Sequence, residues 1–185
     1  MPSGRVARVL RRKTRRDAKN GLSWNGCRPT MALEISERMQ EEIRQHGARA
    51  YPNECCGALL GLPGADDLKE VRALLPLDNR REGEAARTRF LVTADDYRAA
   101  DQAARAQGLE IVGFYHSHPD HPAQPSEFDR DHALPWYSYI VVRVARREDG
   151  QAGGAPQEVT CWVLAEDRSQ FLPEPMRAAA SSNPR

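Results

Sequence analysis

The sequence predicts an α/β fold with a mixed β-sheet and helices packed on it. Helical spacing of apolar residues indicates helices over residues 33–49 and 93–107. Short runs of branched apolar residues predict strands, and residues 138–145 have the strongest β composition in the chain. These two helices are expected to pack on the sheet, and the helix that follows Ser126 is expected to lie at one edge.

The first half of the predicted domain contains one helix and one hairpin. Ser36 is a candidate N-cap for the helix over residues 33–49. Residues 55–62 and 68–77 form two apolar runs separated by the turn sequence of residues 63–67, which predicts an antiparallel hairpin.

The middle of the chain combines a polar loop with a clearly marked helix start. Residues 78–89 are charged and predict a loop, and residues 90–92 predict a short strand. Thr93 is placed to cap the following helix, which has acidic residues in its first turn and ends at Gly108.

The second half of the chain predicts three more elements and a tail. Residues 109–114 form a buried strand, residues 127–134 a short helix capped by Ser126, and residues 158–165 the last strand. Residues 173–185 read as a disordered tail.

Length and charge predict one domain with appendages. Of the 185 residues, 40% are hydrophobic and 29% charged, as in globular proteins, and no apolar run is long enough to cross a membrane. The predicted division is a basic extension over residues 1–30, one domain over residues 31–172 and the tail. The net charge is +1, but residues 1–30 carry +8, which leaves −7 for the rest. A mildly acidic body argues against nucleic-acid binding by the domain.

The basic extension allows several readings. It could be an arm that binds nucleic acid or a membrane surface. Alternatively it is disordered, or translation starts at Met31 and the extension is upstream sequence. It lacks the apolar core of a secretory signal, and no CxxC pair occurs among the four cysteines, so we expect a reducing cytoplasm. Adjacent Cys55 and Cys56 are expected to be buried as small apolar groups on opposite faces of a strand.

The candidate metal-binding residues lie between residues 115 and 129. His116 and His118 are two positions apart at the end of a strand, so their side chains share one face. Pro119 cannot donate to a sheet and should end the strand. Asp129 follows His118 after ten intervening residues. Two imidazoles and one carboxylate are the three protein ligands that a catalytic zinc uses.

This arrangement resembles the JAMM, or MPN-plus, metalloprotease family. The match consists of His116-Ser117-His118-Pro119, followed by Ser126 and Asp129, and an upstream segment from Tyr51 to Gly61 that contains Glu54. The resemblance is closest to small prokaryotic single-domain members and extends from about residue 33 to about residue 172. It implies a JAMM-type, cytidine-deaminase-like fold with a strongly curved mixed sheet.

The resemblance also implies roles for individual residues. One Zn²⁺ would be held by His116, His118 and Asp129, with Glu54 as the base that deprotonates the attacking water. Ser126 would donate a hydrogen bond to the oxyanion. Ser126 could equally be a helix cap, with Asp129 favoured by the helix dipole, and both roles can hold at once.

The remaining histidines of this region do not match the motif. His121 reads as a loop residue near the substrate channel, and His132 is either packed or a neighbour of the ligands. Ser117 should point away from the metal and serve structure.

The resemblance implies a zinc metallopeptidase that cuts a peptide or isopeptide bond after the Gly-Gly terminus of a ubiquitin-like or sulfur-carrier protein. The alternative is a non-catalytic MPN scaffold that binds partner proteins, but such members lose the metal ligands that this chain keeps. A zinc nucleoside deaminase would require His-x-Glu and Pro-Cys-x-x-Cys, and neither occurs. The sequence does not choose the oligomeric state.

Overall fold

The computed structural model describes residues 31–65 and 67–179. The predictions for residues 1–30 and 180–185 lie outside this range. The described chain contains three α-helices: α1 (Glu37–Ala50), α2 (Ala94–Ala106) and α3 (Glu127–His132). A 3-10 helix, η3, covers Gly83–Arg87. The strands are β1 (Ala32–Glu34), β2 (Cys56–Pro63), β3 (Leu68–Leu77), β4 (Glu110–Pro119), β5 (Ser138–Arg146), β6 (Gly154–Leu164), β7 (Phe171–Pro173) and β8 (Met176–Arg177).

The strands form one curled, mixed sheet with the order β7-β6-β5-β4-β2-β3-β1-β8. β4 pairs in parallel with β5, and β1 pairs in parallel with both β3 and β8. The other neighbours are antiparallel, including the predicted β2–β3 hairpin. The α/β fold with a mixed, curved sheet is therefore confirmed.

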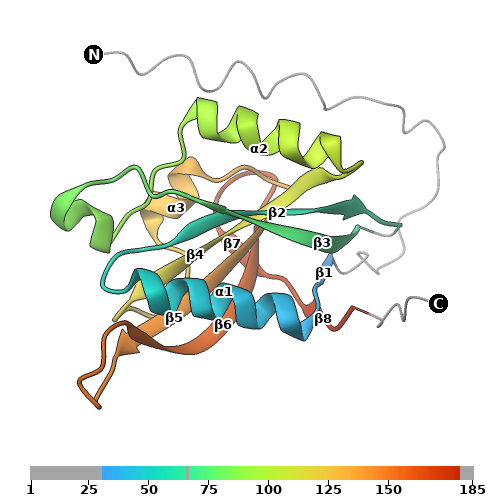
Figure 1. Ribbon diagram of the computed structural model, residues 1–185. Coiled ribbons are helices and arrows are strands. Elements are labelled where there is room, and N and C mark those ends of the chain that lie inside the picture. The colour runs from blue at the N-terminus through green and yellow to red at the C-terminus, as the bar shows by residue number, and fades with distance from the viewer. Residues whose placement is uncertain (1–30, 66, 180–185) are drawn as a thin grey trace, which may run out of the picture.

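The helices cover the sheet from both sides, α2 above and α1 below it in Figure 1. Ile43 of α1 packs in a core that includes Tyr115, whereas Ala100 and Ala104 of α2 pack in a second core beside Phe114. Tyr115 and Phe114 are consecutive in β4, so their side chains point to opposite faces. The same alternation sends His116 and His118 to the α2 side and Ser117 to the α1 side.

The predicted caps of α1 and α2 are both present. The Ser36 side chain accepts a hydrogen bond from the Met39 amide, so α1 begins after it rather than at residue 33. Thr93 and Asp96 form a reciprocal capping box at the start of α2. The chain leaves α2 through Gly108, whose φ of +70° is easily adopted by glycine.

Ser117 serves structure, as its position in the strand predicts. Its hydroxyl accepts a hydrogen bond from the Cys55 amide at 2.9 Å, on the face opposite the histidines. Cys55 and Cys56 are both buried free thiols, in agreement with their expected packing. Within the described ranges, every helix is too short or too polar to cross a lipid bilayer.

Two sequence predictions about strands are wrong. Residues 90–92 form no strand, because this segment lies in a loop in front of β4 and its Phe90 ring packs on His116. Residues 158–165 are not the last strand, because β7 and β8 follow β6.

The predicted tail begins inside the folded domain. Pro173 ends β7, β8 pairs with β1, and the side chain between them, Glu174, is buried. Its carboxylate accepts from the buried Lys69 ammonium at 3.0 Å, and Lys69 also donates to Ser138 at 2.8 Å. A buried charge needs such partners, so residues 173–177 belong to the domain core rather than to a tail.

Candidate metal centre

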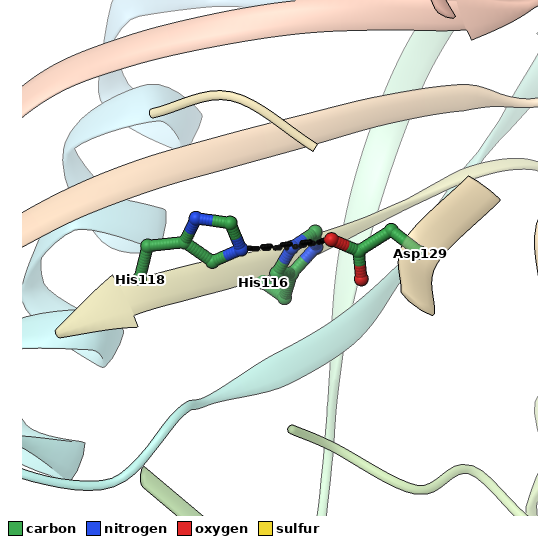
Figure 2. A group of neighbouring side chains, drawn as sticks. All are labelled: His116, His118 and Asp129. Carbon is green, nitrogen blue, oxygen red and sulfur yellow. Dashed lines mark hydrogen bonds and ion pairs between the residues drawn. The ribbon is translucent and has the colours of Figure 1, made fainter. Parts of the chain in front are cut away.

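The two histidines of β4 lie side by side at its carboxyl end. Figure 2 shows both rings on the same face of the strand, directed toward Asp129. Their Nε2 atoms are 3.0 Å apart, and both side chains are buried, His116 at 2% and His118 at 8% exposure. The strand periodicity predicted this shared face.

Asp129 reaches the histidines from the first turn of α3. Ser126 is the N-cap, and its hydroxyl accepts from the Asp129 amide at 3.2 Å. In return, the Ser126 amide and hydroxyl both donate to Asp129 Oδ2 at 2.7 Å. This capping box fixes the carboxylate, and Oδ2 lies 3.6 Å from His116 Nε2 and 3.7 Å from His118 Nε2.

These three donor groups fit a metal ion. Ligand atoms of His116, His118 and Asp129 all lie within 4.8 Å of one another. Zinc bonds of about 2.0–2.1 Å in a tetrahedron would place donor atoms about 3.3 Å apart, close to the separations seen. His118 Nδ1 lies 2.9 Å from the Pro122 carbonyl, which only an N–H can satisfy. This bond leaves the lone pair on Nε2, the nitrogen that faces Asp129.

His116 is oriented differently from His118. Its Nδ1 is buried and has no hydrogen-bond partner among the described residues. Instead, its ring packs against the Phe90 ring with centroids 4.9 Å apart. The loop in front of β4 therefore fixes this imidazole by packing rather than by hydrogen bonding.

The pKa values of the three groups are coupled. Burial lowers the pKa of His116. Burial also disfavours the charged form of His118, but the attraction of Asp129 and a hydrogen bond to the Pro122 carbonyl outweigh it and raise its pKa. Burial works against ionisation of Asp129, yet the nearby imidazoles of His116 and His118 and a hydrogen bond from Ser126 hold its pKa well below the usual range. Asp129 is therefore an ionised, directed carboxylate.

Glu54 is a buried carboxyl group next to these ligands. It lies just before β2 and is 5% exposed. Burial raises its pKa to about 8, against an opposing effect of His118 and with a further increase from Asp129. Glu54 is not part of the three-residue donor group, so it is a neighbouring carboxyl that can accept and release a proton.

The backbone of Glu54 is held by a residue that the sequence did not single out. The Asn79 amide nitrogen donates to the Glu54 carbonyl and to the Arg89 carbonyl, both at 3.1 Å. The Asn79 amide oxygen accepts from the amides of Arg81 at 2.9 Å and Leu91 at 3.2 Å. One carboxamide thus joins Glu54 to the loop that carries Phe90. Asparagine in a polar loop gives no signal in the sequence, because its partners come from distant positions.

Other polar residues take places around the site. His132 is exposed, although its ring lies on the Phe128 ring with centroids 4.1 Å apart, and His121 is exposed as well; both lie outside the donor group. The guanidinium groups of Arg81 and Arg89 lie over the same Phe128 ring, at 5.9 and 4.9 Å from its centroid.

A shallow pocket of about 240 Å³ borders Ser126. It is formed by the residues that precede and begin α3 together with β6 and the turn before β7, namely Gln124, Pro125, Ser126, Glu127, Arg130, Trp162, Ser169, Gln170 and Phe171. Ser126 therefore belongs both to the candidate site and to the lining of this pocket.

Comparison with known proteins identifies relatives of this chain. Desampylase of Haloferax volcanii is 32% identical over 117 residues, which cover 62% of this chain and 79% of that protein. A probable TtuB-protein conjugate cleaving protease of Thermus thermophilus is 30% identical over 111 residues, covering 60% and 70%. A solution structure of a Salinibacter ruber protein is 44% identical, with a TM-score of 0.61, and the match covers 84% of this chain and 95% of that one.

The family model described as prokaryotic homologs of the JAB domain matches residues 36–165. This range begins at the cap of α1 and ends just after β6, so it contains Glu54, both histidines, Ser126 and Asp129. The chain therefore belongs to the prokaryotic JAB-domain family.

Proposed function

We propose that this protein is a zinc-dependent metallopeptidase with one Zn²⁺ per chain. Its substrate would be a ubiquitin-like or sulfur-carrier protein, cut at the peptide or isopeptide bond after a Gly-Gly terminus. The observation that carries the proposal is the convergence of His116, His118 and Asp129 beside the buried Glu54 carboxyl. A donor set alone would favour metal binding only, and the additional buried carboxyl favours catalysis.

The names of two relatives support the substrate class. One is called desampylase, and the other is described as a probable protease that cleaves TtuB-protein conjugates. Both matches cover at least 70% of the relative, so the comparison spans most of each protein. We extend to this chain the hydrolysis of a bond between a small carrier protein and the group attached to it.

Glu54 would move the proton in this reaction. A zinc ion in the site would lower the pKa of water toward ~7 and polarise the scissile carbonyl. Without a cation nearby, burial keeps the pKa of Glu54 at about 8. A positive charge held by the three ligands favours the carboxylate form, which can accept a proton from the attacking water. As the C–O bond forms and the C–N bond breaks, Glu54 would return that proton to the departing amine.

Ser126 would stabilise the negative charge that develops on the carbonyl oxygen. Its hydroxyl and its backbone amide both donate to Asp129 Oδ2 in the resting arrangement. If the hydroxyl turns to the oxyanion, the amide still holds Asp129 in place. One such donor is worth about 3 kcal/mol of transition-state stabilisation. The capping role and the catalytic role of Ser126 are thus compatible.

The test is turnover of defined carrier fusions. Ubiquitin-like carriers ending in Gly-Gly would be joined to a lysine side chain or to a single amino acid, and cleavage followed by mass spectrometry. We expect cleavage after the second glycine, loss of cleavage with a chelator and recovery when zinc is added back. A protein that holds zinc but cleaves none of the fusions would instead support the alternative of a partner-binding scaffold.

A further inference from the structure

Two arginines near the candidate metal centre have no ion-pair partner in the part of the chain that the structure describes. Arg81 and Arg89 come from the loop between β3 and α2, and both guanidinium groups lie on the Phe128 ring. Phe128 immediately precedes Asp129 in α3. Neither arginine forms an ion pair with any carboxylate of residues 31–65 and 67–179. Two like charges are therefore concentrated next to the reacting centre.

Two acidic residues near this loop, Asp78 and Asp96, pair with a neighbouring arginine. Arg80 contacts Asp78 at 3.6 Å and Asp96 at 3.1 Å. Arg81, the next residue, points instead toward Phe128, and its Nε is buried without a hydrogen-bond partner among the described residues. A buried N–H donor without an acceptor is unfavourable. This position therefore favours a ligand that supplies a hydrogen-bond acceptor.

The pair is fixed to the reacting centre through Asn79. Its carboxamide accepts from the Arg81 amide, donates to the Arg89 carbonyl and donates to the Glu54 carbonyl. The loop backbone that carries both arginines is thus tied to the candidate base, while their side chains rest on the residue before a candidate metal ligand. A group bound between these guanidiniums would lie close to the bond that is cut.

We propose that Arg81 and Arg89 form a subsite that binds a carboxylate of the substrate. The inference rests on the proposed function and names a chemical feature of its substrate. The planar guanidinium matches a carboxylate with two parallel hydrogen bonds, and carboxylates are the ordinary anions of a protein substrate. The carboxylate can belong to the amino acid that is released, or to an acidic side chain of the carrier close to its Gly-Gly end.

Two pairs of substrates separate these sources. The first pair is a carrier joined through Gly-Gly to an amino acid with a free α-carboxylate, and the same conjugate with an α-carboxamide. The second pair is a carrier with acidic residues before Gly-Gly, and one with their neutral amides. Each pair is measured by kcat/KM with the zinc-loaded protein. Affinity is measured separately by calorimetry with the Glu54→Gln protein, which should bind without cleaving.

We expect a preference of about ten- to hundredfold for the carboxylate member of one pair, which identifies the source. The Arg81→Gln/Arg89→Gln variant should reduce this ratio to near one in both kcat/KM and affinity. Arg87→Gln is the matched control, because Arg87 is exposed in the same loop and contacts neither Phe128 nor Asn79. This control should keep the preference.

Three outcomes would overturn the subsite: no carboxylate preference in either pair, a preference that survives in the double variant, or an equal loss for charged and neutral substrates. The affinity measurement keeps this test separate from the proposed function. If no conjugate is cleaved but the carboxylate preference in binding depends on the two arginines, the peptidase proposal fails and the subsite stands.

Discussion

The side chain of Asn79 donates to the backbone carbonyl of Glu54 at 3.1 Å, so a residue in the loop after β3 fixes the carboxyl-bearing residue in front of β2. The same carboxamide makes three more hydrogen bonds within the loop of residues 79–91. All four of its hydrogen-bonding positions are thereby used. The placement of Glu54 relative to the metal ligands therefore depends on this loop.

Replacing Asn79 by alanine should lower kcat by about 10- to 100-fold, because small displacements of a catalytic group have large effects on rate. Zinc content should stay at the wild-type level, since no ligand contacts Asn79. Asn53→Ala is the control: Asn53 is exposed beside Glu54, and no side-chain hydrogen bond of Asn53 occurs in the described structure. Equal loss of activity in both variants, or loss of zinc in Asn79→Ala, would contradict a positioning role.

Replacing His118 by alanine should abolish zinc binding and activity, because it removes one of three protein ligands. Metal analysis should find well below ~0.1 zinc per chain, against about one for the wild type. His121→Ala, three positions later in the exposed loop, should keep both zinc and turnover. Stoichiometric zinc in His118→Ala would mean that another group completes the site.

Replacing Glu54 by glutamine should keep the zinc and reduce kcat by about 10²- to 10⁴-fold, the usual contribution of a general base. The amide is similar in size to the carboxyl group but cannot accept a proton. Single-turnover cleavage and metal analysis of the same preparation give both quantities. Wild-type turnover in this variant would remove Glu54 from the mechanism.

Replacing Ser126 by alanine should have two separate effects. Loss of the oxyanion donor should reduce kcat by about 10²-fold, and loss of the N-cap should destabilise the protein by about 1 kcal/mol. Ser126→Thr keeps a hydroxyl for both roles and should recover most of the stability and activity. If Ser126→Ala lost stability but kept its turnover, the hydroxyl would be a cap only.

In the metal-free protein, the contribution of Glu54 to the free energy of unfolding should fall as pH rises. Burial raises the pKa of Glu54 from 4.5 to about 8, so in this range the folded state binds a proton that the unfolded state releases. The contribution of the protonated group is therefore complete below the unfolded pKa and is lost as pH rises through about 8. Thermal unfolding of chelator-treated wild type and Glu54→Gln should give similar midpoints near ~pH 4 and a higher midpoint for the variant near ~pH 9. A constant difference between the two proteins across this range would contradict the shift.

Local signals in the sequence predicted much of the fold. The Thr93 and Ser126 caps, the β2–β3 hairpin and the shared face of His116 and His118 depend on residues close together in the chain, and all are present. By contrast, β1 and β8 contain three and two residues and exist through parallel pairing with distant strands, which no local pattern announces. Phe90 has strand-like neighbours, but its ring packs on His116 outside the sheet.

The candidate site likewise contains residues that a local motif predicts and residues that depend on contacts with distant parts of the chain. Motif spacing singled out the three donor residues, Glu54 and Ser126, and the structure brings the donors together. Asn79, Arg81 and Arg89 were missed because a charged loop has no periodicity, and their partners are set only when the loop folds against α3. Residues that hold or flank a site are thus harder to recognise than those that match a motif.

The pairing of Lys69 with Glu174 has a consequence for how the chain folds during its synthesis. These residues are 105 positions apart, and both are almost fully buried. During synthesis, the ammonium group emerges from the ribosome long before the carboxylate that neutralises it. Until Glu174 arrives, burial of Lys69 would leave an uncompensated charge in the interior. The nascent domain should therefore remain open at this edge, and ribosome-bound chains that end before Glu174 should be cut readily by proteases.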